Sequence, residues 1–166
     1  MNETSSPISD LKRQMLRHTL ATLAYRGAKA IDEAPVGFGA FRAGETSRTA
    51  GEILSHLADL LVWALLMTKG DFTWPGNEVL QWDEEVARFF SAAKEFDSYL
   101  VSDEKLFTEV EKLFQGPIAD ALTHVGQLTL LRRLAGAPIR GENYVKANIV
   151  AGCVGLEQSS ERFEFD

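Results

Sequence analysis

Apolar residues recur at helical spacing through most of the chain, in four stretches separated by loops. The pattern predicts helices over residues 10–32, about 50–68, about 82–100 and 117–136. In the first stretch the repeating small and apolar positions are Leu16, Leu20, Leu23, Gly27 and Ile31. No two stretches alternate apolar and polar residues as paired strands do. The pattern therefore predicts an all-α fold, and four long helices favour a four-helix bundle.

Two of these helices carry recognisable end signals. Thr49 and Glu52 have the spacing of a capping box, which marks the start of the second helix. Pro117 is expected in the first turn of the fourth helix, where its missing N–H costs nothing. Arg132 and Arg133 fall in the last turn of that helix, where positive charge suits the helix dipole.

Two further segments are less regular. The stretch "SDEKLFTEVEKLF" predicts a short extra helix, with Ser102 or Asp103 as its N-cap. After Ala137 the chain predicts either a short helix or an irregular segment packed on the bundle. Its polar residues Tyr144, Lys146 and Asn148 could then lie over the mouth of the bundle and meet a substrate.

Composition narrows the class of protein. The 166 residues are 45% apolar and 25% charged, which fits one globular domain over 10–166 after a flexible tail over 1–9. A net charge of −7 argues against binding nucleic acid or an acidic membrane surface. The apolar run 53–67 is shorter than a membrane span and contains His56, so it is expected to be a buried helix.

The chain has a single cysteine, Cys153, so no intramolecular disulfide and no thiolate cluster can form. The first ten residues lack the basic and apolar regions of a signal peptide. Both observations favour a cytoplasmic protein. Cys153 itself is expected to act as a small apolar side chain rather than as a nucleophile.

Three ionisable residues interrupt apolar helix faces. At about 100° per residue, Asp120 and His124 lie on one face of the fourth helix among apolar neighbours. His56 lies on the apolar face of the second helix. Buried charge is costly unless it is paired or bound to a metal, so the pattern leaves two hypotheses. Either Asp120 and His124 form a hydrogen-bonded pair, or they share a divalent metal with His56.

Other residues near these faces have competing interpretations. Glu52 is one turn before His56, but its capping role explains it better than metal binding does. Asp59 and Gln127 are candidates for hydrogen bonds around the metal ligands. Trp63 could line a pocket above the metal, although a core role is favoured.

The segments "GEILSHLADLL" and "HVGQLTLLRRLAG", with the order of helices between them, resemble the DinB-like superfamily of helical bundles. The resemblance spans nearly the whole chain. It implies an up-down-down-up four-helix bundle, often dimeric, with His56 and His124 as two metal ligands. Asp120 stands where the family often has histidine, although related thiol-dependent isomerases use a carboxylate at that position.

The resemblance also implies a cofactor and a chemistry. One divalent metal ion per chain is expected, with zinc first and nickel, iron or manganese as alternatives. The implied activity is a transferase or isomerase reaction on a small molecule, using a low-molecular-weight thiol. The alternatives are a non-catalytic metal-binding or stress-response protein, or a metal-free bundle acting through a dimer surface. A homodimer is also expected because the second helix is apolar on both faces.

Overall fold

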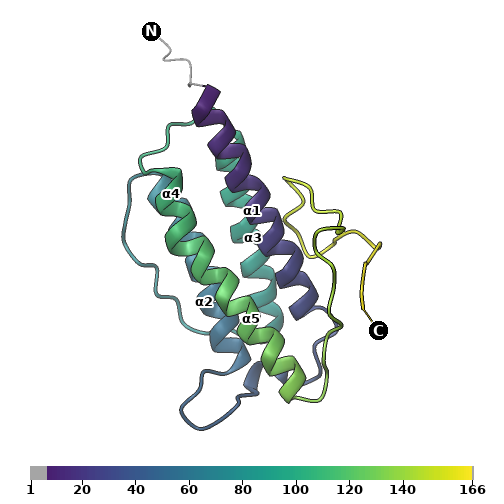
Figure 1. The fold of residues 1–166 in the computed structure, drawn as a ribbon. Helices are drawn as coiled ribbons and strands as arrows, with labels where there is room; N and C mark the ends of the chain where they lie inside the picture. Colours follow the sequence, from purple (N-terminus) through teal and green to yellow (C-terminus); the bar gives the residue numbers. More distant parts are fainter. Residues whose placement is uncertain (1–6, 166) are drawn as a thin grey trace.

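The computed structural model describes residues 7–165, and this part of the chain is all-helical (Figure 1). The elements are α1 (Pro7–Ile31), a 3₁₀ turn η1 (Phe38–Ala40), α2 (Ala50–Thr68), α3 (Trp82–Val101), α4 (Val110–Leu113), a π-turn η2 (Phe114–Ile118) and α5 (Ala119–Leu134). Within the described residues, extended pairing is limited to one isolated bridge between Glu142 and Glu164. The predicted all-α class is confirmed.

Local sequence explains where α2 begins. Thr49 Oγ1 accepts a hydrogen bond from the Glu52 N–H, and a Glu52 carboxylate oxygen accepts one from the Thr49 N–H. This confirms the predicted capping box, which satisfies two N–H groups at the start of α2. The first helix begins at Pro7, three residues before its predicted start, so the expected tail over 1–9 is helical at its end. Residues 1–6 of that tail lie outside the described residues.

The fourth long helix differs from its prediction. Helical backbone runs without interruption from Val110 to Leu134, and Pro117 lies inside it rather than in its first turn. In a regular α-helix the proline ring would clash with the carbonyl four residues earlier, and the wider π-turn η2 relieves that clash. The predicted short helix shrinks to α4, and Ser102 ends α3 instead of capping the next helix.

The core surrounds α2, which is buried on nearly all sides. Leu54, Leu57, Ala58 and Leu61 are all fully buried. By length and composition α2 could cross a membrane, but 67% of the relevant window is buried inside the protein, as in the core helix of a bundle. The second apolar face of α2 is therefore covered within the chain, and it does not require a second subunit.

Arg132 joins the ends of α1 and α5 and is only 5% exposed. Its guanidinium donates hydrogen bonds of 2.7–3.2 Å to the carbonyl oxygens of Ala30, Asp32, Glu33 and Ala137. This is more than the predicted interaction with a helix dipole. One buried cation satisfies the last carbonyls of α1, which otherwise lack partners.

The segment after α5 is irregular and lies along α1 (Figure 1), so the second of its two predicted forms is the one observed. Glu142 fixes it in place. Its buried carboxylate accepts hydrogen bonds from Tyr25 at 2.7 Å and from Lys29 at 2.8 Å. Lys29 also binds Glu164 at 2.7 Å. Ion pairs and tyrosine contacts, rather than helix packing, hold this segment on the bundle.

Candidate metal centre

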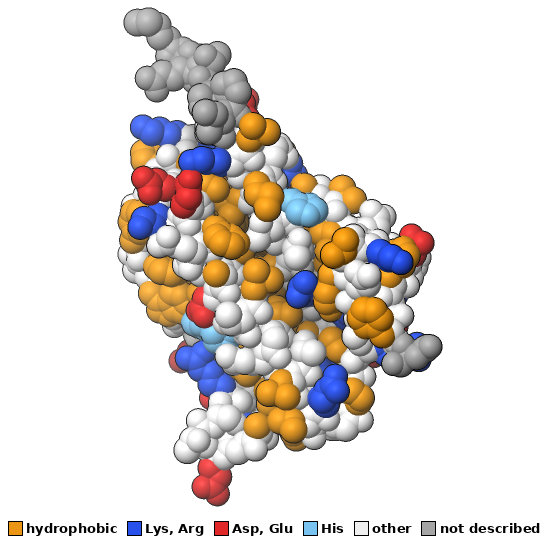
Figure 2. Space-filling view, in the orientation of Figure 1, with side chains coloured by type: hydrophobic (Ala, Val, Ile, Leu, Met, Phe, Trp, Pro, Cys, Tyr) orange, Lys and Arg blue, Asp and Glu red, His pale blue; other side chains and the backbone are white. Residues whose placement is uncertain are grey.

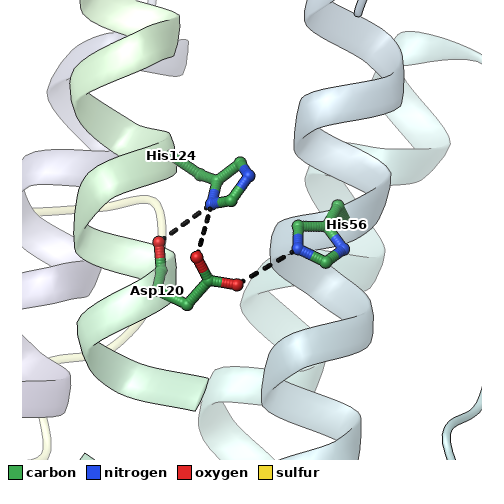
Figure 3. Close-up of side chains that lie close together, drawn as sticks. All are labelled: His56, Asp120 and His124. Carbon is green, nitrogen blue, oxygen red and sulfur yellow. Dashed lines mark hydrogen bonds and ion pairs between the residues drawn. The ribbon is translucent and has the colours of Figure 1, made fainter. Parts of the chain in front are cut away.

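Three donor side chains from two helices converge between α2 and α5 (Figure 3). His56 comes from the second turn of α2, while Asp120 and His124 come from the first turns of α5. One possible ligand atom from each residue lies within 4.8 Å of the other two. The His56 Nε2 atom is 3.3 Å from Asp120 Oδ2, and His124 Nδ1 is 3.3 Å from Asp120 Oδ1. The predicted helical geometry thus brings the three residues together.

The spacing of the donor atoms is compatible with a bound metal as well as with hydrogen bonding. Ligands at about 2.0–2.1 Å from a tetrahedral metal are separated by roughly 3.3–3.4 Å. The separation of 3.3 Å between His56 Nε2 and Asp120 Oδ2 matches that value. The same contact is a long hydrogen bond in the metal-free arrangement. These three residues could hold a metal ion.

Each imidazole has a nitrogen lone pair to offer. His124 Nδ1 is 2.9 Å from the Asp120 carbonyl oxygen, which only accepts, so in the tautomer that donates from Nδ1–H the lone pair is on Nε2. Burial lowers the pKa of His56, and the nearby His124 acts in the same direction, while the hydrogen bond to Asp120 opposes both. The net shift keeps the His56 imidazole neutral at neutral pH, as a metal ligand must be.

The centre is open on one side. The exposed side-chain fractions are 22% for His56, 12% for His124 and 46% for Asp120. Three protein ligands with solvent access leave coordination positions for water or substrate, which is the arrangement of a catalytic rather than a structural site.

The other predicted site residues lie outside the triad. Glu52 is occupied by the capping box described above. Gln127 is exposed on α5. Lys146 and Asn148 are exposed on the C-terminal segment, which packs along α1, so the prediction that they cover the mouth of the bundle is wrong. The reason is the Glu142 anchor, which fixes this segment to Tyr25 and Lys29.

Asp59 belongs to a separate buried network between α2 and α3. Its carboxylate binds the Arg88 guanidinium at 2.5 Å and the Asn77 side-chain amide at 2.8 Å. Arg88 also binds Glu85 at 2.9 Å and the Ser55 hydroxyl at 2.8 Å. Asp59 therefore ties the loop between α2 and α3 to the bundle, rather than orienting a metal ligand directly.

A tryptophan that the sequence analysis did not consider contacts the triad. The Trp74 ring lies 5.5 Å from the His56 ring, centroid to centroid, and 5.6 Å from the ring of Trp63. Trp63 thus contacts the ring that contacts His56. Trp74 lies in an irregular loop, where no periodicity predicts its position, and a Trp-Pro-Gly sequence signals only a turn.

Similarity to known proteins adds nothing to this geometry. A comparison of the chain with protein-family models, with curated proteins and with solved structures finds no match. The assignment of a function to the chain rests on the arrangement of His56, Asp120 and His124.

Proposed function

We propose that this chain is a metal-dependent enzyme of the DinB-like type, which acts on a small molecule with a low-molecular-weight thiol. The observation that carries the proposal is the convergence of two imidazoles and one carboxylate within 4.8 Å. His56 is 64 or more positions from the other two, and all three lie on apolar helix faces where such residues are costly. The partial exposure of Asp120 supports a catalytic role, because a reacting molecule needs an open coordination position.

In this proposal, each residue of the triad has a defined task. His56 and His124 supply neutral nitrogen ligands, and Asp120 supplies an oxygen ligand with negative charge. A divalent metal bound there lowers the pKa of a coordinated thiol or water and so provides a nucleophile near neutral pH. Zinc is proposed first because it accepts this mixed N/O set in a four-coordinate site, with nickel, iron and manganese as alternatives.

The proposal includes the up-down-down-up connection of the four long helices. Two long-range contacts support it. The Arg13 side chain near the start of α1 donates to the Ser102 carbonyl at the end of α3, at 2.9 Å. Arg132 joins the ends of α1 and α5. Helix α3 therefore runs against α1, and α5 runs with it.

A cytoplasmic homodimer is also proposed. Large apolar side chains remain exposed on α1 and α5: Leu11, Met15, Leu130 and Leu134 are each more than half exposed. The two pairs lie near opposite ends of the bundle, and we propose that a second copy of the chain covers one of them. Light scattering at micromolar concentration tests this, and a monomer would remove the dimer from the proposal.

The alternative is a non-catalytic metal-binding protein, for which the low exposure of His124 is the favourable observation. The two functions differ in whether the bound ion exchanges its water. Relaxation of solvent protons by the Mn²⁺-loaded protein measures that exchange directly. Fast exchange supports the enzyme, and a sealed ion supports the structural role.

The deciding experiment is elemental analysis of untagged protein purified without chelator. We expect about one equivalent of a transition metal in the wild type and very little in His56→Ala or His124→Ala. The matched control is His18→Ala, since His18 is an exposed histidine on α1 outside the triad. Saturating metal at 100 times its Kd should also stabilise the wild type by about 2.7 kcal/mol. Absence of metal, even after zinc, nickel, iron and manganese are added, would contradict the proposal.

A further inference from the structure

Aromatic side chains extend the candidate metal centre along the surface. We call Trp63, Phe72 and Trp74 the aromatic shelf. Trp74 contacts the His56 ring, and Trp63 meets Trp74 edge to face at an interplanar angle of 74°. The Trp63 indole N–H donates to the Phe72 carbonyl at 3.1 Å, so its polar group is satisfied and its apolar surface remains. Trp74 and Trp63 therefore form an apolar surface that starts at His56, and the Phe72 backbone is hydrogen-bonded to its far side.

The shelf is exposed. Trp74 is 43% exposed and Phe72 is 57% exposed, although large aromatic side chains gain most from burial. Figure 2 shows hydrophobic side chains gathered at the left of the view, beside a histidine and an acidic side chain. An apolar surface that borders a polar metal-binding group is typical of a ligand site, where a few polar groups fix an otherwise apolar molecule.

The loop after α2, which carries Phe72 and Trp74, is held at both ends. At its start, the Asp71 N–H donates to the Leu66 carbonyl at 3.0 Å. Near its end, the Asp59 carboxylate accepts hydrogen bonds from the backbone and side chain of Asn77, and Glu85 accepts one from the Leu80 N–H at 2.8 Å. Asp59 is thus a positioning residue for Trp74. A shelf fixed in this way binds a ligand without first losing loop entropy.

A cleft of about 600 Å³ continues the shelf away from the triad. Phe72 lines both, and Met67, Leu106 and Phe107 provide the rest of the apolar lining. Along α2, the eleven residues from His56 to Met67 correspond to about 16 Å. The triad, the shelf and the cleft therefore form a path suited to an elongated molecule rather than to a compact one.

We infer that the ligand of this centre is an elongated small molecule, with a metal-binding donor group at one end and a flat aromatic body that lies on Trp74, with Trp63 at its side. This inference rests on the proposed function, because the donor end is recognised by the metal. It adds to that proposal the chemical class of the ligand's other end, which is aromatic. A small hydrophilic substrate would leave the shelf uncovered.

The probes that test this are hydroxamates, which share one metal-binding group and differ in the attached body. Isothermal titration of the zinc-loaded protein compares acetohydroxamate with benzohydroxamate. We expect benzohydroxamate to bind roughly tenfold more tightly, since a stacked ring buries apolar area against Trp74. In Trp74→Ala the ratio should fall to about two. In the control Phe165→Ala, which removes an aromatic side chain of similar exposure from the C-terminal segment, the ratio should stay as in the wild type.

A second variant tests the far end of the path without altering the His56 contact. Phe72→Ala should weaken the binding of 4-phenylbenzohydroxamate several-fold and leave benzohydroxamate nearly unchanged. The inference would be overturned if benzohydroxamate and acetohydroxamate bound equally well. It would also be overturned if Trp74→Ala kept the preference for benzohydroxamate. Neither result would contradict the metal site. The metal content of the same samples distinguishes failure of this inference from failure of the proposed function. A protein that binds no metal would contradict both.

Discussion

Arg132 offers a sharp test of how the bundle is held at one end. Arg132 is 5% exposed, and its guanidinium donates to four carbonyls, three around the end of α1 and one after α5, with N···O distances of 2.7–3.2 Å. Burial lowers the pKa of Arg132, and the nearby negative charges of Asp32 and Glu33 oppose that effect. The cation therefore stays charged but carries a desolvation cost, which its hydrogen bonds offset.

The magnitude follows from those hydrogen bonds. A hydrogen bond to a charged group contributes about 1.5–3 kcal/mol, and its loss leaves buried carbonyls unsatisfied. Water entering the space left by Arg132→Ala satisfies part of them, so the contributions do not simply add. We expect Arg132→Ala to lower the free energy of unfolding by about 3–5 kcal/mol. Arg132→Lys should recover only part of this, because one ammonium cannot reach all four carbonyls.

The assay is urea denaturation followed by far-ultraviolet circular dichroism, with m-values compared between variants. The control is Arg133→Ala, the exposed neighbour on the same helix, for which we expect a change within about 0.5 kcal/mol. A loss below about 1 kcal/mol for Arg132→Ala would refute the reasoning, because the carbonyls at the end of α1 would then not depend on the guanidinium.

Two other predictions concern stability. Burial alone would raise the pKa of Glu142, but the hydrogen bonds from Lys29 and Tyr25 outweigh it and hold the pKa below its usual 4.5. The stability that Glu142 contributes is therefore present above pH 4.5 and is lost as the pH falls through the folded-state pKa. Urea titrations should show that the difference in free energy of unfolding between wild type and Glu142→Gln becomes smaller below pH 4.5. A difference that does not depend on pH would contradict this. For the glycines of two helices, Gly51→Ala should destabilise, because its new Cβ would lie 2.9 Å from the Gly39 carbonyl oxygen. Gly126→Ala should stabilise the protein by about 0.5–1 kcal/mol, since no atom outside its own helix backbone lies within 4 Å of the new Cβ. Thermal melts in which Gly51→Ala is the more stable variant would contradict the close approach at Gly51.

The sequence predicted the features that depend on local periodicity. Helices α1, α2 and α3 end within a few residues of their predicted bounds, because apolar spacing and capping residues are local signals. The convergence of Asp120 and His124 on His56 was also predictable, since a rotation of about 100° per residue fixes which residues share a helix face.

The features that the sequence did not predict depend on contacts between distant segments. Nothing near Trp74 indicates that its ring contacts His56, because the Asp59–Asn77 hydrogen bond that positions the loop joins two separate elements. The anchoring of the C-terminal segment has the same origin, since Tyr25 and Glu142 are 117 positions apart. Pro117 misled the prediction because the common rule places proline in a first turn, whereas the π-turn is a rarer accommodation.

The π-turn η2 has a consequence for how this centre could arise or vanish. A π-turn is one residue longer than an α-helical turn, so it acts as a single-residue insertion that sets the rotation of α5 relative to α4. Pro117→Ala would remove the reason for the widened turn and keep the extra residue in the chain. A regular helix would then turn Asp120 and His124 by about 100° relative to α4, away from His56. A change of one codon could thus separate the ligands and leave every other helix in place. Related chains could gain or lose the metal through the width of this turn, with the three ligands unchanged.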